Sequence, residues 1–171
     1  MAEEIRDDLE DILLSGTPKD LDRFLKTHPI KAETLNEMRF QSGEKVGYFA
    51  ARYCSEYEYS VDLTRQRKMI SVLLKYGLNL NDPSDIPPIS VISVENLEWL
   101  VSKGAKLNYR FYGNDLKRIT PIGLAGVCAK KEEKPTPEDI ARYELMKKIK
   151  SRQQAYRQTR LVLLQKQGKE K

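Results

Sequence analysis

Apolar residues recur at helical spacing along most of the chain. Ile5, Leu9 and Ile12 are three or four residues apart and predict a helix over residues 3–14, which Gly16 ends. The same period predicts further helices over residues 18–27, 31–40, 44–53, 62–76, 89–92, 94–103, 120–130 and 136–167. Loops rich in glycine and proline separate them. The pattern therefore predicts an all-α protein.

The same pattern assigns side chains to faces. In the helix over residues 31–40, Leu35, Met38 and Phe40 are expected to point inward. In the helix over residues 62–76, the apolar positions Ile70, Leu73 and Leu74 are expected in the core. The bases of that helix are expected mostly in solvent: Arg65, Arg67, Lys68 and Lys75.

One segment of the chain occurs twice. Leu73–Asn81 returns 27 residues later as Leu100–Asn108, and each copy runs from the end of a helix through a glycine to Leu-Asn. Gly77 and Gly104 are expected to end their helices, because glycine enters the left-handed conformation without a steric penalty. The asparagine that closes each copy is expected to bond backbone in the turn that follows. A repeated structural unit is indicated.

This repeat, followed by Thr-Pro-Ile-Gly-Leu-Ala at Thr120–Ala125, resembles the ankyrin repeat. Gly47–Ala51 and Pro87–Ser90 resemble the start of the same unit in earlier copies. Gly123 stands where the family has a histidine that ties neighbouring repeats, so the last repeat is expected to be looser or capped differently. The resemblance implies an ankyrin-like solenoid of stacked helix hairpins, with about four degenerate repeats and projecting hairpin fingers.

Two segments are expected on this basis. Residues 1–135 form the ankyrin-like repeat domain, and residues 136–171 form a C-terminal capping helix with a basic tail that projects beyond the repeats. The first half of that helix carries an apolar stripe, consisting of Ile140, Tyr143, Met146 and Ile149. Beyond Lys150 the stripe thins.

Composition fits a soluble protein. The 171 residues are 40% hydrophobic and 32% charged, and no apolar run approaches the roughly 20 residues that cross a bilayer. The first residues are acidic, unlike a signal peptide. We expect a cytoplasmic protein without a membrane partner, or one delivered to the cytosol of another cell as an effector. Cys54 and Cys128 are expected as buried thiols on helices.

Charge is distributed unevenly along the chain. Residues 1–22 carry eight acids and two bases, whereas residues 136–171 carry ten bases and four acids. Solvated helix faces explain both segments, and so does steering of a charged partner. The basic helix keeps nucleic-acid binding open as an alternative function.

Motifs for catalysis, phosphate binding and metal binding are absent from the sequence. The single histidine, His28, adjoins Pro29 at the end of a predicted helix and is expected to face the helix dipole or solvent. We therefore expect no enzyme activity, no cofactor and no metal site.

Two aromatic segments are candidate contact surfaces. Residues 55–60 alternate tyrosine with acid, and residues 109–119 combine three aromatic residues with three bases at the position of an ankyrin finger, where Gly113 and Asn114 fit a tight turn. The candidate partner-binding residues are Tyr109, Arg110, Phe111, Tyr112, Asn114, Lys117, Tyr57 and Tyr59. The alternatives are that Phe111 and Leu116 only pack the finger on its neighbour, and that the two earlier tyrosines cover helix ends.

The expected function is that of a non-catalytic protein-binding module that masks, inhibits or positions a partner protein. The resemblance implies roles such as enzyme inhibitor, immunity protein or effector. The alternative is nucleic-acid binding by the C-terminal helix through Lys147, Lys148, Lys150, Arg152, Arg157 and Arg160. A third interpretation is oligomerisation through this helix, including pairing with the acidic N-terminus of another copy.

Overall fold

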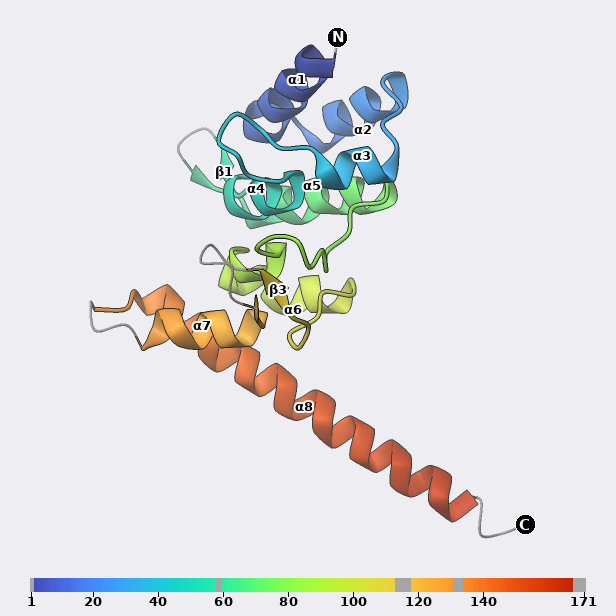
Figure 1. The fold of residues 1–171 in the computed structure, drawn as a ribbon, viewed down its shortest axis with the longest axis vertical. Helices are drawn as coiled ribbons and strands as arrows, with labels where there is room; N and C mark the ends of the chain where they lie inside the picture. The colour runs from blue at the N-terminus through green and yellow to red at the C-terminus, as the bar shows by residue number, and fades with distance from the viewer. Residues whose placement is uncertain (1, 58–59, 113–117, 131–133, 168–171) are drawn as a thin grey trace. The chain divides into compact units, whose positions relative to one another are not determined.

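A computed structural model describes residues 2–57, 60–112, 118–130 and 134–167, and it confirms a mostly helical chain with a long C-terminal helix (Figure 1). The helices are α1 (Ala2–Ser15), α2 (Pro18–Thr27), α3 (Ala32–Glu37), α4 (Val46–Tyr53), α5 (Leu63–Lys75), the short 3₁₀ helix η1 (Pro88–Ser90), α6 (Val94–Ser102), α7 (Pro121–Ala129) and α8 (Pro137–Gln167). Two antiparallel hairpins pair β1 (Glu56–Tyr57) with β2 (Ser60–Val61), and β3 (Phe111–Tyr112) with β4 (Arg118–Ile119).

The chain divides into two compact units, residues 1–121 and residues 122–171. Nearly all of α7 therefore belongs to the same unit as α8. The sequence analysis had placed this segment in the repeat domain, because its Thr-Pro start resembles that of a repeat.

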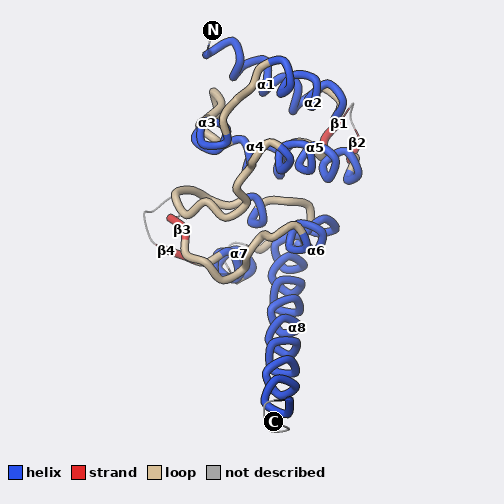
Figure 2. Tube along the Cα trace, turned by 90° about the vertical axis from the view of Figure 1, so that its right-hand side faces the viewer, coloured by secondary structure: helices blue, strands red, loops and turns tan. Residues whose placement is uncertain are grey.

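Unit 1 is built from three successive helix pairs. In each pair an N-terminal helix contacts the helix that follows it: α1 with α2, α4 with α5, and η1 with α6. Successive pairs stack, because α4 contacts both α1 and η1 while α5 contacts both α2 and α6 (Figures 1 and 2). The largest fully buried side chains of the unit include Leu9, Leu13, Leu21, Leu25, Met69, Ile70, Leu73, Ile89 and Leu97. Two rows of helices thus share one apolar core.

Local sequence signals set most helix ends. Thr17 and Asp20 form a reciprocal capping box at the start of α2, and the Asp62 side chain accepts a hydrogen bond from the backbone N–H of Arg65 at the start of α5. Gly77 and Gly104 follow α5 and α6 with φ angles of 93° and 102°, a conformation that only glycine adopts cheaply. The predicted role of both glycines is confirmed.

Two predicted helices are shorter than expected. α3 ends at Glu37, and Met38 is extended rather than helical, although Phe40 is buried as expected. The segment over residues 89–92 forms only the 3₁₀ turn η1, because consecutive prolines remove backbone donors at its start. Ser93 stands at the N-cap of α6, but its side chain makes no capping hydrogen bond.

Arg65 corrects the face assignment of α5. Its side chain is buried, not solvent-facing, and its guanidinium donates hydrogen bonds to three backbone carbonyls, those of Leu13 (2.9 Å), Gly16 (2.8 and 3.1 Å) and Cys54 (2.9 Å). Two of these carbonyls lie at the C-terminal end of α1, where helices leave carbonyls without intrahelical partners. Arg65 therefore ties α5 to the end of α1.

Unit 2 contains α8 and α7 from Ile122 onward. A Cβ atom at Gly126 would approach the Tyr143 ring to 3.1 Å, so the small residue permits close packing of the two helices. The buried side of α8 differs in part from the predicted stripe. Met146 and Ile149 are buried as expected, but Arg142 is buried as well and Ile140 is 45% exposed. Every described side chain from residue 151 to residue 165 is exposed.

Candidate functional site

Two asparagines tie the connections between the helix pairs of unit 1. Asn36 Nδ2 donates to the Gly77 carbonyl (2.9 Å), and its Oδ1 accepts from the Asn79 N–H (2.6 Å). Asn81 makes the same two contacts one pair later, with the Gly104 carbonyl (2.9 Å) and the Lys106 N–H (2.8 Å). Each asparagine thus holds the turn that ends the next pair, and not a turn directly beside it as expected.

The sequence analysis missed Asn36, although a signal was present. The dipeptide Leu35-Asn36 matches Leu80-Asn81 and Leu107-Asn108, and only the last two lie in the segment that repeats visibly. Asn108, the third member, is exposed and makes no side-chain hydrogen bond within the described residues.

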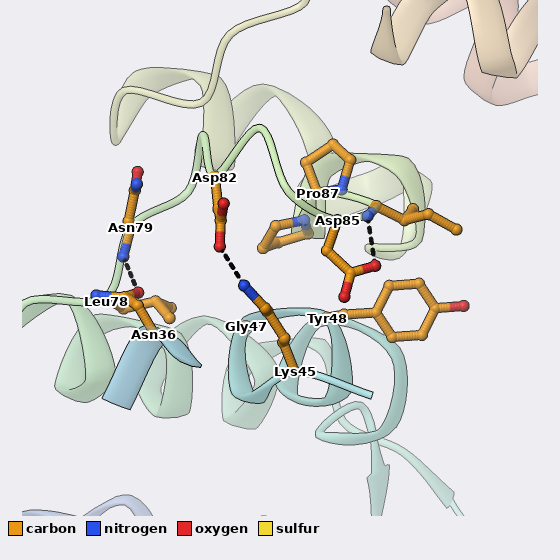
Figure 3. A pocket seen from close by; sticks show the side chains of 11 residues that line it. Asn36, Lys45, Gly47, Tyr48, Leu78, Asn79, Asp82, Asp85 and Pro87 are labelled. Atoms are coloured by element: carbon orange, nitrogen blue, oxygen red, sulfur yellow. Dashed lines mark hydrogen bonds and ion pairs between the residues drawn. The ribbon is translucent and has the colours of Figure 1, made fainter. Parts of the chain in front are cut away.

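Ion pairs join the same connections. Lys45 Nζ contacts Asp82 (2.6 Å), as Figure 3 shows. The same ammonium donates to Ser84 Oγ (2.8 Å), and Arg39 pairs with Asp85 (2.7 Å). Burial alone would raise the pKa of the Asp82 carboxyl, but the hydrogen bonds from Lys45 and Ser84 outweigh it, so this pKa is lowered. The connections therefore form a cross-linked surface rather than independent loops.

A pocket between these connections is too small for an organic ligand. Its lining residues are Asn36, Lys45, Gly47, Tyr48, Leu78, Asn79, Asp82, Asp85, Ile86, Pro87 and Pro88 (Figure 3). The pocket encloses about 20 Å³. That volume holds about one water molecule, whereas small-molecule sites span about 300–1,000 Å³.

The hairpin β3–β4 is anchored at its base. Phe111 is fully buried, and the Tyr112 N–H donates to the Pro83 carbonyl (3.0 Å) in the preceding connection. The Tyr109 hydroxyl is also buried and has no hydrogen-bond partner among the described residues, and burial raises the pKa of this phenol. Phe111 therefore exposes no surface to a partner in this chain, in agreement with the alternative that it packs the finger on its neighbour, and Tyr109 offers no accessible hydroxyl. The buried Phe111 side chain and the buried Tyr109 hydroxyl therefore belong to the base of the hairpin and not to its exposed surface.

Among the described residues at this hairpin, three exposed side chains define the finger surface: Arg110, Tyr112 and Arg118. The Arg118 guanidinium lies 5.2 Å from the centroid of the Tyr112 ring and donates to its hydroxyl (3.1 Å). Tyr112 is 42% exposed. The stacked pair presents an aromatic ring and a cation in a fixed arrangement.

Arg118 was not among the predicted site residues, although it belongs to the same basic and aromatic segment. The structure pairs it with Tyr112 in the hairpin. The predicted site residues Asn114 and Lys117 lie outside the described residues.

The hairpin β1–β2 lies apart from the finger surface. Hairpin β1–β2 connects the two helices of one pair, α4 and α5, whereas β3–β4 follows the last helix of a pair, α6. The two hairpins lie apart in both views of the fold (Figures 1 and 2). Tyr59 and the side chain of Tyr57 lie outside the described part of the chain.

The six predicted nucleic-acid contacts all lie on α8: Lys147, Lys148, Lys150, Arg152, Arg157 and Arg160. All are exposed except the half-buried Lys150, and Lys147 pairs with Glu144 (2.6 Å). By the helical period, the last four share one side of α8, within about 160° of its circumference, whereas the first two do not.

The structure also bears on metal ligands, membrane-spanning helices and the two cysteines. Among the described residues, no group of three or more His, Cys, Asp and Glu side chains could hold a metal ion. In the same part of the chain, no helix has the length and apolar character needed to cross a membrane. Both cysteines are free; Cys54 is buried as expected, while Cys128 is half-buried. Burial raises the pKa of the Cys54 thiol to about 12.

Comparisons of the chain with protein-family models, with curated proteins and with solved structures find no match.

Proposed function

We propose that this chain is an ankyrin-like solenoid of about four degenerate repeats and acts as a non-catalytic protein-binding module. Three observations support the fold: paired helices that stack in two rows, glycines with positive φ at equivalent helix ends, and asparagines that tie successive turns. A cytosolic site of action, in the same cell or in another, fits the two free thiols.

The finger surface carries the proposal. Tyrosine and arginine are enriched among residues that dominate protein interfaces, because they contribute large contact area and several donors. The stacked pair of Tyr112 and Arg118 stands on a hairpin anchored by the buried Phe111, so its geometry is largely fixed before a partner arrives. Arg110 adds a second cation, which favours a partner with exposed carboxylates. We infer that the chain masks or positions such a partner by binding it through the finger surface.

Matched variants of the full chain test the proposal. The finger variant carries Arg110→Ala and Arg118→Ala, and its control carries Lys103→Ala and Lys106→Ala, which remove the same charge from exposed positions of unit 1. Each protein is used to capture partners from nuclease-treated extract of the native host, followed by calorimetry with the purified partner. We expect the finger variant to lose about 30-fold in affinity, equivalent to about 2 kcal/mol, and the control to bind normally.

Two results would contradict this assignment. Equal binding by the finger variant and its control would remove the finger surface from the interface. Recovery only of nuclease-sensitive material, lost with Arg157→Gln and Arg160→Gln, would favour the alternative that α8 binds nucleic acid. That alternative is supported by the absence of acids between Glu144 and Glu170 and by the four bases on one side of α8.

A further inference from the structure

The second half of α8 has one chemically distinct side that nothing in the described residues covers. Tyr156, Leu163 and Leu164 are 70%, 55% and 55% exposed, and by the helical period they lie on the side that carries the four distal bases. We call this set the α8 stripe: Lys150, Arg152, Tyr156, Arg157, Arg160, Leu163 and Leu164. The opposite side holds mainly uncharged residues, among them Ser151, Gln154, Ala155, Gln158 and Gln165.

The exposed face of α1 is the complement of this stripe. It carries the acids Glu3, Glu4, Asp7, Asp8 and Asp11, all exposed except the half-buried Asp7, and it ends in Leu14, which is 43% exposed. No ion pair reaches Glu3, Asp8 or Asp11 within the described chain. The same holds for Lys150, Arg157 and Arg160 on α8. Each helix therefore concentrates like charges that repel one another.

The two faces also match in spacing. When Leu14 is set beside Leu163, a constant offset of 149 residues places Asp11 beside Arg160 and Asp8 beside Arg157. The same offset places Glu3 beside Arg152. Because both segments are α-helices with the same rise, three opposite charges and one apolar pair lie at matching heights along the two axes when the helices are parallel.

We propose that α1 of one copy docks in parallel on the α8 stripe of a second copy, so that the chain associates head to tail. Pairing of two α8 helices is disfavoured, since both lack acids over residues 145–167 and would repel. Phosphate binding would account for the bases, but it leaves the exposed leucines of the stripe without a role. An acidic helix that ends in an exposed leucine accounts for both.

Sedimentation velocity of the full chain tests this association. At low ionic strength, about 20 mM, the weight-average mass should exceed the 19.8 kDa of one chain and rise with concentration, as a head-to-tail contact requires. At about 500 mM salt it should return to that of one chain, because exposed charges are screened. A single chain at both ionic strengths would overturn the proposal.

Matched variants locate the contact. Arg157→Gln with Arg160→Gln, and Gln154→Glu with Gln158→Glu, change the net charge of α8 equally, but only the first pair lies on the stripe. The first should abolish association and the second should preserve it. Equal behaviour of the two would refute the assigned face.

An exchange of charges between the two faces tests whether α1 and the α8 stripe contact each other. A protein with Asp8→Lys and Asp11→Lys, and another with Arg157→Glu and Arg160→Glu, should each sediment as single chains. When they are mixed, both contacts regain opposite charges and association should return. A mixture that remains monomeric would show that α1 and the α8 stripe are not partners.

Discussion

Arg65 is a charged residue with a structural role, because its buried side chain holds helices of unit 1 together. A charged side chain is rarely buried unless its donors are satisfied, and here carbonyls at the end of α1 and of α4 accept them. The bond to Cys54 brings in the last turn of α4 as well. One side chain thus connects three helices of unit 1.

Replacing Arg65 should therefore destabilise the whole unit. Arg65→Met keeps a long apolar stem but removes the guanidinium hydrogen bonds to three backbone carbonyls, of which, within the described residues, only that of Leu13 keeps another donor, the Cys54 thiol (3.3 Å). We expect a loss of about 3 kcal/mol in the free energy of unfolding. Urea denaturation followed by circular dichroism measures the loss. Lys68→Met, an exposed position on the same helix, is the control and should change stability by less than about 0.5 kcal/mol. Similar losses for the two variants would contradict the role of Arg65.

The burial of Arg65 was open to prediction from its spacing. Arg65, Met69 and Leu73 are four residues apart, so they share one face of α5, and both apolar members are fully buried. Arg65 was expected in solvent because it is charged, although the helical period places it on the buried face of α5. The carbonyls of Leu13 and Gly16, by contrast, lie 52 and 49 residues away in sequence, and no local pattern reveals them as partners of Arg65.

At the scale of elements, helices were predicted better than hairpins. The helical period and the two glycines with positive φ located the helices of unit 1, because these signals are local. At the candidate site, Phe111 was predicted to bind a partner but is buried, whereas Arg118 was not predicted and is exposed opposite Tyr112. Register depends on contacts such as that of Tyr112 with Pro83, which the sequence does not display.

The asparagine ties give a prediction with an internal control. Asn81→Ala removes the side-chain bonds to Gly104 and Lys106, and we expect unfolding to become easier by about 1–2 kcal/mol. Asn36→Ala should behave alike, because its bonds to Gly77 and Asn79 are equivalent. Asn108→Ala, at the matching position without such bonds, should be nearly neutral. Urea titration of the three variants decides the matter, and a neutral Asn81→Ala would show that the ties do not hold the connections together.

Over the whole chain, acidic and basic segments lie at opposite ends of the sequence, and this was evident from composition alone. What composition does not show is which charges are already paired. Asp22 of α2 accepts hydrogen bonds from Lys26 (2.7 Å), from Lys75 (2.7 Å) and from the Tyr76 hydroxyl (3.0 Å). It thereby links α2 to α5, in contrast to Glu3, Asp8 and Asp11 of α1, which no ion pair reaches in the described part of the chain.

This link predicts how stability depends on pH. The ammonium groups of Lys26 and Lys75 hold the pKa of the Asp22 carboxyl well below its ordinary value of 3.8. Because the pKa is lower in the folded state, the stabilisation is complete above about pH 4 and declines as the pH falls through the folded value. Asp22→Asn should therefore be less stable than the natural chain at neutral pH, and the difference should narrow steadily below about pH 4. Urea unfolding at a series of pH values measures the difference, and one that stayed constant into acid would show that these ion pairs do not stabilise the fold.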